Sequence, residues 1–401
     1  MHDEITRALP KHRSSSVGKA RVVVIWLGLV TGLLTIIALY PQIFGSHAAD
    51  ITDIYYHLRL VQNMKLSGSW NLYSVFFILT YALSFGSKNI YVLGVIGTIL
   101  LTAAVIAKAI LSYFIVEKAA HSKLAAGFIT LALILVMPLP NWWDPGEIFI
   151  DKIAPSIWFN STAMFNLPFD ILLFFGAVKW LQGKTIGSFI WVAVFSLLSV
   201  LTKPNYILAF FPMIGLCVVG NAAIKRNWSA YQALLLYLGL ALALGCALGV
   251  QYMDTFTGTS PLPVISRPEV SPLGLAPLAV WSQWSPNIVA SLLLSLAFPL
   301  GVVVLFFKEI KHNFTVLLAW GVFAIALLQY MLLTETGEAA ADGNWGWGSN
   351  LAIYILFLVS VTTFVSQPRS FKFYFVAALF GLHVASGIYY YLNIARGEGF
   401  V

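Results

Sequence analysis

The sequence predicts an all-α polytopic membrane protein with about 11 transmembrane helices (10 to 12), because apolar runs of about 18 residues or more recur along its length. Of its 401 residues, 59% are hydrophobic and 10% are charged, and the mean hydropathy is +0.85. A soluble globular protein is about a quarter charged. The apolar runs are continuous and do not alternate with polar residues, which favours helices over a β-barrel.

Basic residues predict the orientation of the chain. Residues 1–21 form a basic tail, and short basic connectors recur between the later apolar runs. Lys and Arg concentrate in cytoplasmic loops, so the net charge of +7 indicates topology and not binding to nucleic acid. The run after the tail is long enough to span and lacks a cleavage pattern, so we interpret it as a retained helix. We expect a cytoplasmic N-terminus and an outer C-terminal tail at 393–401.

Residues 22–392 form one transmembrane domain in this prediction. The expected helices are 22–44, 90–116, 124–140, 161–180, 186–202, 204–220, 231–251, 288–307, 314–334, 348–366 and 373–392. The apolar stretch 71–86 is short, and counting it as a crossing would break the alternation of basic connectors. We therefore expect a surface-lying or re-entrant helix there, with a twelfth crossing as the alternative. The outer loops are then 45–89, 141–160, 252–287 and 335–347, and acidic residues concentrate in them.

The segment DITDIYYHLRL, residues 50–60, places two carboxylates beside the first apolar run. Asp53 and His57 are four residues apart and would share a helix face, with Arg59 projecting toward water with them. Asp50 would cap the helix or lie just before it. A carboxylate at a membrane interface can act as a general base when burial raises its pKa toward neutrality. His57 would orient it, or bind a pyrophosphate or metal with it. The alternative is a capped amphipathic helix without chemistry.

The outer loop 141–160 combines tryptophans with Asp144, Glu147 and Asn160. Aromatic rings suit the C–H faces of a sugar, and carboxylates suit its hydroxyls. The helix that begins after Asn160 would direct its N-terminus toward an anion. Tryptophans are also common at membrane interfaces, so a purely structural belt is the alternative.

Two further segments contain groups suited to a lipid-linked sugar. Lys203 and Asn205 flank Pro204, which breaks a helix, and a lone cation there suits a lipid phosphate; a snorkelling lysine is the alternative. The glycine-rich segment 334–348 can approach a ligand closely, and a tight structural loop is the alternative. Its candidate sugar-binding residues are Glu335, Glu338, Asp342, Asn344, Trp345 and Trp347.

Two charges, Lys108 and Asp170, lie within apolar runs. A charge at the bilayer centre costs roughly 2.5–3.5 kcal/mol on insertion scales, so the two could pair, and we expect structural roles for both. Cys217 and Cys246 also lie in apolar runs. We interpret them as core residues and not as disulfide or metal ligands.

The layout resembles the GT-C superfamily of membrane glycosyltransferases, which have a first helix, a long outer loop with a catalytic acid and surface helices, and then a polytopic bundle. In this resemblance Asp53, or Asp50, matches the first-loop acid, and 71–86 matches the second surface helix. The resemblance implies a polyprenyl-phosphate-linked sugar donor, with Lys203 and Arg267 as candidates for its phosphate. A divalent cation would be held by Asp53 and His57. The paired prolines often found before the second surface helix are missing.

On this interpretation the protein transfers a sugar at the outer face of a membrane, in cell-envelope glycan or lipid modification. Asp53 would deprotonate the acceptor hydroxyl, and the partners would be the bilayer, the lipid-linked donor and a glycan, lipid or protein acceptor. We expect the inner (plasma) membrane of a bacterium as the location. The alternatives are a polysaccharide polymerase or ligase that uses lipid-pyrophosphate donors, a transporter or flippase, and a structural subunit.

Overall fold

The computed structural model describes residues 12–46, 48, 52–68, 70, 73–141, 148–183, 185–256, 273–337, 340 and 342–398. Helices form most of this part of the chain. The elements are α1 (His12–Phe44), α3 (Asp53–Ser67), α4 (Val75–Leu83), α5 (Ile90–Glu117), α6 (Lys123–Leu135), α7 (Ser161–Gly183), α8 (Ile186–Thr202), α9 (Asn205–Lys225), α10 (Trp228–Phe256), β1 (Gly274–Leu275), α11 (Ala279–Trp284), α12 (Ile288–Leu305), α13 (Phe307–Ile310), α14 (Phe314–Leu332), β2 (Leu333–Thr334), η2 (Asn344–Gly346), α15 (Trp347–Val365) and α16 (Phe371–Arg396). Strands β1 and β2 pair antiparallel.

The predicted membrane class is confirmed. Nine helices in the described ranges are long and apolar enough to cross a membrane, and α6 and α8 are shorter apolar helices. Each of the helices that we expected from the sequence corresponds to one of these elements. The chain is therefore an integral multi-pass protein, while a total of about 11 crossings depends on whether α6 and α8 also span.

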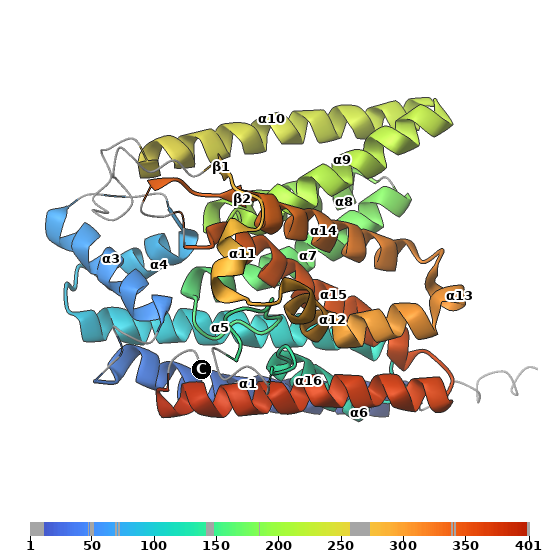
Figure 1. Cartoon of the computed structure of the whole chain (residues 1–401), viewed down its shortest axis with the longest axis horizontal. Coiled ribbons are helices and arrows are strands. Elements are labelled where there is room, and N and C mark those ends of the chain that lie inside the picture. Colours follow the sequence, from blue (N-terminus) through green and yellow to red (C-terminus); the bar gives the residue numbers. More distant parts are fainter. Residues whose placement is uncertain are drawn as a thin grey trace, which may run out of the picture.

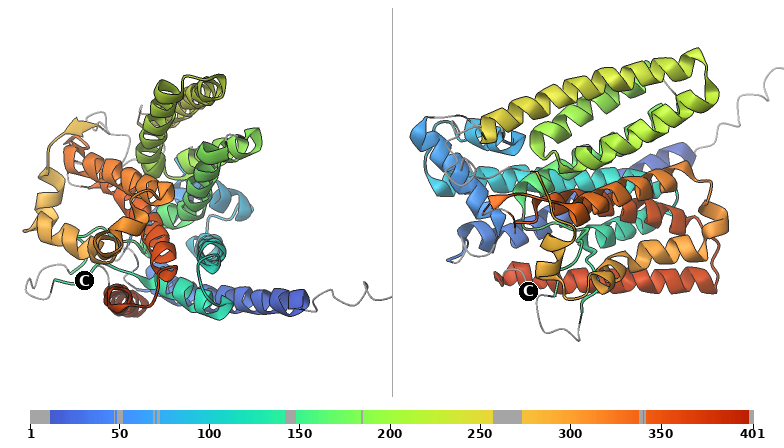
Figure 2. Two further views of the ribbon diagram at one scale, coloured as in Figure 1. Left: turned by 90° about the vertical axis from the view of Figure 1, so that its right-hand side faces the viewer. Right: turned by 45° about the horizontal axis from the view of Figure 1, so that its top comes forward.

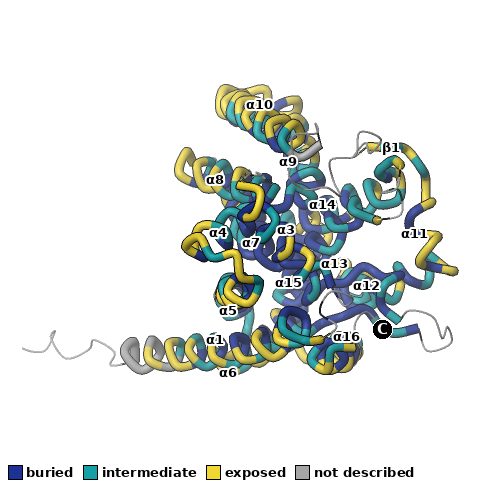
Figure 3. Tube along the Cα trace, turned by 90° about the vertical axis from the view of Figure 1, so that its left-hand side faces the viewer, coloured by how far each residue is buried: buried dark blue, intermediate teal, exposed yellow. Residues whose placement is uncertain are grey.

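The long helices run side by side, and the short elements gather at the ends of the bundle (Figure 1). Helices α3 and α4 lie at the same end as the C-terminal end of α16, and α13 lies at the other (Figures 1 and 2). Helices α7 and α15 form the centre (Figure 3), with 78% and 83% of their spans buried, whereas only 17% of the span of α10 is buried. The groups near the starts of α7 and α15 are thus enclosed by protein, and α10 leaves most of its surface for lipid.

Two capped helices follow α1. Thr52 is the N-cap of helix α3, and its hydroxyl accepts from the Ile54 N–H at 3.4 Å. Asp50 is therefore not the cap, and its alternative place just before the helix lies outside the described residues. Gly68 ends α3 with a φ of 72°, a conformation that glycine adopts without strain. Helix α4 has nine residues and is about 14 Å long, too short to cross a hydrocarbon core of about 30 Å.

The connection from α6 to α7 returns into the core of the protein. Helix α6 ends at Leu135, before the predicted end at 140, because Pro138 and Pro140 cannot continue it. The extended segment that follows lies along α16, where the Met137 N–H donates to the His383 carbonyl at 3.1 Å. Residues 148–160 are then largely buried. A segment that we predicted as an outer loop is therefore part of the wall of the site.

Candidate active site

A hydrogen bond joins the start of α3 to the start of α7. The Asn160 amide donates from Nδ2 to Asp53 Oδ2 at 2.7 Å. Its Oδ1 accepts from the Ala163 N–H and from Thr162 Oγ1, both at 2.9 Å. Asn160 thus caps α7 with one end of its amide and orients the Asp53 carboxylate with the other.

Lys203 also contacts the N-terminus of α7. It lies directly after α8, where Pro204 prevents the helix from continuing. Its ammonium Nζ donates to Thr162 Oγ1 at 3.2 Å and lies 4.5 Å from the centre of the Trp347 ring, within cation–π range. Burial lowers the pKa of Lys203, attraction to Asp53 and Glu335 partly offsets this, and the resulting pKa is about 8.

These contacts form one chain of hydrogen bonds. It runs from Lys203 Nζ to Thr162 Oγ1, from Thr162 Oγ1 to Asn160 Oδ1, and from Asn160 Nδ2 to Asp53 Oδ2. Among the described side chains Lys203 and Asp53 do not form an ion pair within 4.0 Å. The cation and the carboxylate are therefore held on opposite sides of two neutral side chains.

The glycine- and tryptophan-rich segment packs onto this group. Asn205 Nδ2 donates to the Asn344 carbonyl, and Asn344 Nδ2 donates to Glu335 Oε2, both at 2.8 Å. A Cβ atom at Gly348 would lie 2.9 Å from the Asn205 carbonyl oxygen. Glycine is therefore required for α15 to start this close to α9.

The two described acids of this segment have raised pKa values. Burial raises the pKa of Glu335, while the Asn344 hydrogen bond lowers it. Burial also raises the pKa of Asp342, and so does repulsion from the Asp53 carboxylate. Asp53 repels Asp342, and Lys203 attracts both Asp53 and Glu335, so these four charged groups belong to one site.

Two cavities lie on either side of this group. The first, which we call the aromatic cavity, has a volume of about 470 Å³ and is lined by Asp53, Phe149, Lys152, Phe159, Trp284, Tyr330, Asp342, Trp347, Asn350 and Tyr390 among others. The second, the lysine cavity, has a volume of about 340 Å³ and is lined by Thr162, Lys203, Asn205, Leu208, Leu248, Glu335, Asn344 and Trp345 among others. Trp347 faces the first cavity and contacts the lysine of the second, so its ring is part of the wall between them.

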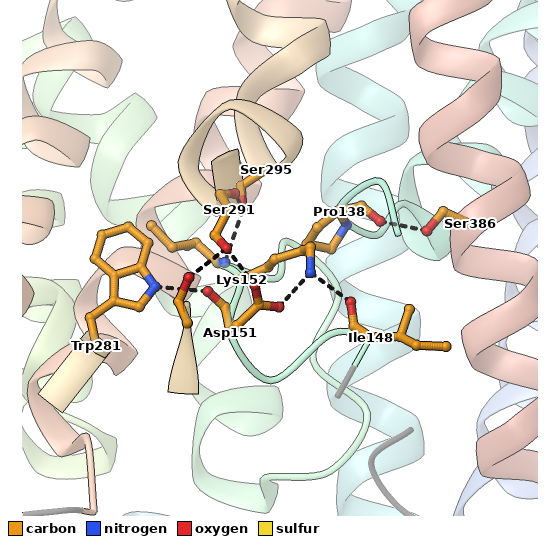
Figure 4. Close-up of polar contacts among 10 residues, drawn as sticks. Pro138, Ile148, Asp151, Lys152, Trp281, Ser291, Ser295 and Ser386 are labelled. Atoms are coloured by element: carbon orange, nitrogen blue, oxygen red, sulfur yellow. Dashed lines mark hydrogen bonds and ion pairs between the residues drawn. The ribbon is translucent and has the colours of Figure 1, made fainter. Parts of the chain in front are cut away.

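A buried polar network holds the wall of the aromatic cavity. Trp281 Nε1 donates to the Asp151 carbonyl at 2.7 Å, and Lys152 and Ser291 both contact the Asp151 carboxylate (Figure 4). Two backbone N–H groups of this segment are also bonded, that of Ile153 to Ser295 Oγ at 3.0 Å and that of Ala154 to Asn350 Oδ1 at 2.8 Å. The network fastens residues 148–160 to α11, α12 and α15, which determines where Asn160 lies.

The structure corrects the expectation for His57. Its ring is buried and shares a hydrogen bond of 2.7 Å with Ser161 Oγ, so it does not project toward water with Arg59, which is exposed and bonded to Gln62. Burial, and to a smaller extent the charge of Lys203, lower the pKa of His57 to about 3. His57 is therefore a neutral residue that positions α3 against α7.

A metal site is not supported by the residues that are described. No group of three or more His, Cys, Asp and Glu side chains gathers in these ranges. Asp53 Oδ2 and His57 Nδ1 are already bonded to Asn160 and Ser161. One atom of each side chain is thus occupied, and among the described residues no third ligand joins the pair, so we derive no step that needs a cation.

The two charges inside apolar runs do not pair with each other. Asp170 accepts from Asn166 at 2.8 Å and from Ser199 at 2.7 Å. Lys108 lies 4.6 Å from the centre of the Tyr354 ring. Asn166 also donates to the Lys203 carbonyl at 3.3 Å. The Asp170 cluster is therefore bonded to the backbone that carries Lys203.

The structure brings together most of the predicted residues that it describes. Asp53, Asn160, Lys203, Asn205, Glu335, Asp342, Asn344, Trp345 and Trp347 line or join the two cavities. Other predicted site residues lie outside the described ranges, namely Asp50, Asp144, Glu147, Arg267 and Glu338.

Sequence reasoning missed the roles of Thr162, Ser291 and Ser295. The four-residue spacing of the two serines within an apolar helix was a usable signal for a polar partner, because it places both on one face.

No protein-family model matches the sequence, and no curated protein matches it. One similar solved structure is described as archaeal oligosaccharyltransferase AglB from Archaeoglobus fulgidus in complex with an inhibitory peptide and a dolichol-phosphate. The TM-score is 0.45 and the identity 12%, over 94% of this chain and 56% of that chain. The present chain thus spans little more than half the length of that one. Similarity at this level identifies neither family nor function, so function has to be inferred from the geometry of the site.

Proposed function

We propose that the protein is a membrane glycosyltransferase that moves a sugar from a polyprenyl-phosphate donor to an acceptor at the outer face of the membrane. The observation that carries this proposal is the hydrogen-bond chain from Lys203 to Asp53 between two cavities. Transfer of a sugar from a lipid phosphate needs a cation beside the leaving phosphate and a base beside the acceptor hydroxyl. The hydrogen-bond chain links one of each, with Lys203 lining one cavity and Asp53 lining the other.

The lysine cavity suits the donor. Leu208 and Leu248 offer apolar contacts from the long helices α9 and α10, and Lys203 offers a buried ammonium group. An ammonium that hydrogen-bonds a phosphate oxygen makes a strong, charge-assisted contact. Glu335, Asn344 and Trp345, which we predicted to bind a sugar, line the same cavity, so we assign them to the sugar of the donor.

The aromatic cavity suits the acceptor. Asn160 occupies Oδ2 of Asp53, which leaves Oδ1 for an acceptor hydroxyl. That hydroxyl gives its proton to Asp53, and its oxygen bonds to the anomeric carbon of the donor. The bond between this carbon and the phosphate oxygen breaks, and the phosphate leaves as an anion beside Lys203. Asp342 and Trp347 line this cavity, so we assign them to the acceptor.

The test is transfer by the purified chain in lipid nanodiscs. Mass spectrometry of copurified lipids would identify the donor, which is then supplied with a labelled sugar. Asp53→Asn should lower the transfer rate by about 10²–10⁴-fold, the usual contribution of a positioned base, and should leave polyprenyl phosphate binding unchanged.

Glu117→Gln is the matched control, because Glu117 lies far along α5 and pairs with Lys123 at 3.5 Å. It should keep full activity. Full activity of the Asp53→Asn variant would remove Asp53 from the role of base. Transfer that occurs only from a lipid-pyrophosphate donor would instead favour a polymerase or ligase.

A further inference from the structure

The aromatic cavity has the walls of a saccharide site. Phe159, Trp284, Tyr330 and Trp347 present rings to it, and apolar faces with a few convergent polar groups are typical of small-molecule sites. Tyr390 also lines this cavity, and its buried hydroxyl has no hydrogen-bond partner among the described residues. The Tyr390 side chain is fully buried, so the rings and the carboxylates of the cavity, and not this hydroxyl, are the groups that a ligand would meet.

The charges of the aromatic cavity are not balanced. Asp53 and Asp342 line it with carboxylates. The cation in its wall is Lys152, whose ammonium group is fully buried and bonded to the Asp151 carboxylate and, at 2.8 Å, to the Ile148 carbonyl. Its charge is therefore neutralised by Asp151.

Lys203 lines the other cavity, and although its charge attracts Asp53, among the described side chains it forms no ion pair within 4.0 Å with Asp53 or Asp342. The carboxylates of Asp53 and Asp342 already repel each other, because Asp53 adds to the effect of burial in raising the pKa of Asp342. An anionic ligand would meet the same repulsion from both acids.

We propose that the aromatic cavity binds an uncharged or amine-bearing saccharide as the acceptor, and that Asp342 excludes acidic saccharides. This inference rests on the proposed function and specifies its acceptor. The rings stack on the C–H faces of the sugar, and one hydroxyl faces Asp53. Asp342 accepts a hydrogen bond from a neighbouring hydroxyl or ammonium group and repels a carboxylate or phosphate. Discrimination by repulsion of the wrong ligand is a common source of specificity.

The experiment compares three pyranosides that differ in one group: a neutral hexoside, its 2-amino counterpart and its 6-carboxylate counterpart. Binding to the full chain in nanodiscs is followed by saturation-transfer NMR and by quenching of tryptophan fluorescence. The neutral and amino sugars should bind, and the uronate should bind at least about tenfold more weakly at low salt. This difference should shrink as salt screens the charges.

Asp342→Asn is the decisive variant. It should bring the affinity for the uronate to within about threefold of that for the neutral sugar, because one of the two repelling charges is removed. The control Glu117→Gln should keep the original difference. Equal rejection of the uronate by Asp342→Asn and by the unmodified chain would overturn the role of Asp342.

Polyprenyl phosphate binding is measured in the same preparation. It distinguishes failure of the acceptor assignment from failure of the proposed glycosyltransferase function. Uronate binding as tight as that of the neutral sugar would overturn the charge selection. Failure of all three sugars, with the lipid phosphate still bound through Lys203, would overturn the saccharide assignment and leave the donor site intact. If the unmodified chain neither binds these sugars, nor binds polyprenyl phosphate, nor transfers sugar, the proposed function itself is overturned.

Discussion

The lysine cavity and the aromatic cavity share a wall but present different groups to a ligand. The lysine cavity combines aliphatic contacts from α9 and α10 with one buried ammonium group and the single carboxylate of Glu335. The aromatic cavity combines rings with two carboxylates. The difference teaches that neighbouring cavities can bind two ligands of unlike chemistry, the donor and the acceptor. This requires that the layer of side chains shared by the two cavities is rigid. Thr162 and Asn160 form part of that layer. The predictions below test the aromatic cavity, the lysine cavity and the layer in turn.

The largest effect is expected for the support of the aromatic cavity. Asp151→Asn leaves the buried Lys152 ammonium group without its counter-charge, and breaking a buried pair in this way costs about 3–5 kcal/mol. We expect a marked fall in the melting temperature, followed by intrinsic tryptophan fluorescence in detergent. Removing both charges, in Asp151→Asn with Lys152→Met, should recover part of the loss, because an uncharged pair needs no compensation.

The half-exposed pair of Glu117 and Lys123 gives the comparison for this effect. Its side chains are 25% and 31% exposed, so Glu117→Gln should cost at most about 1 kcal/mol. Equal melting temperatures for Asp151→Asn and Glu117→Gln would contradict a structural role for the Asp151 network.

The next effect concerns the cation of the lysine cavity. Lys203→Ala should weaken polyprenyl phosphate binding by about 10–100-fold, because a charge-assisted hydrogen bond contributes about 1.5–3 kcal/mol. The affinity of the unmodified chain should also depend on pH. The pKa of Lys203 is lowered from 10.5 to about 8, so the group is protonated below pH 8 and loses its charge as the pH rises through that value.

Titration with polyprenyl phosphate between pH 7 and pH 10 checks this dependence. Affinity should be constant at the lower end and fall about tenfold per pH unit above about pH 8, which follows from loss of the single proton. Lys203→Arg should remove the dependence, because a guanidinium group stays protonated throughout this range. A flat profile for the unmodified chain would exclude Lys203 as the phosphate ligand.

The smallest effect is expected for the layer between the cavities. Thr162→Val removes the hydroxyl that accepts from Lys203 and donates to Asn160. Loss of a hydrogen bond of about 1 kcal/mol should slow transfer by about fivefold, with a smaller effect on donor binding. Thr162→Ser restores the hydroxyl and should restore the rate.

Thr202→Val is the matched control for this layer. Thr202 lines the lysine cavity too, but its buried hydroxyl has no partner among the described residues. Its loss should therefore leave the transfer rate unchanged. A Thr162→Val enzyme with the same kcat as the unmodified chain would show that the two sides of the wall act independently.

Much of the fold could be predicted from local sequence. The run 90–116 can be recognised as a membrane-spanning helix from its own residues. The length of an apolar helix does not depend on what the helix packs against. The same holds for Pro204, which ends α8 wherever that helix lies. Where a second local signal was missed, as at Pro138 after α6, the predicted helix extended too far.

The site could be predicted only in part. Asp53 and Lys203 stood out as polar residues beside apolar runs, but nothing in their neighbourhoods indicated Asn160 and Thr162 as the link between them. The Asn160–Asp53 bond joins residues 107 positions apart. The pairing that seemed natural for Lys108 and Asp170 proved wrong, because each found nearer partners in the fold.

The sequence by itself determined that this chain is a bundle of membrane helices with acids and a lone lysine next to helix ends, since hydropathy and helix breaking act within a few turns of the chain. The tertiary structure alone decided which of these groups meet. Hydrogen bonds between buried side chains require distances near 3 Å and defined directions, and such geometry results from the packing of α3, α7, α8 and α15 against one another.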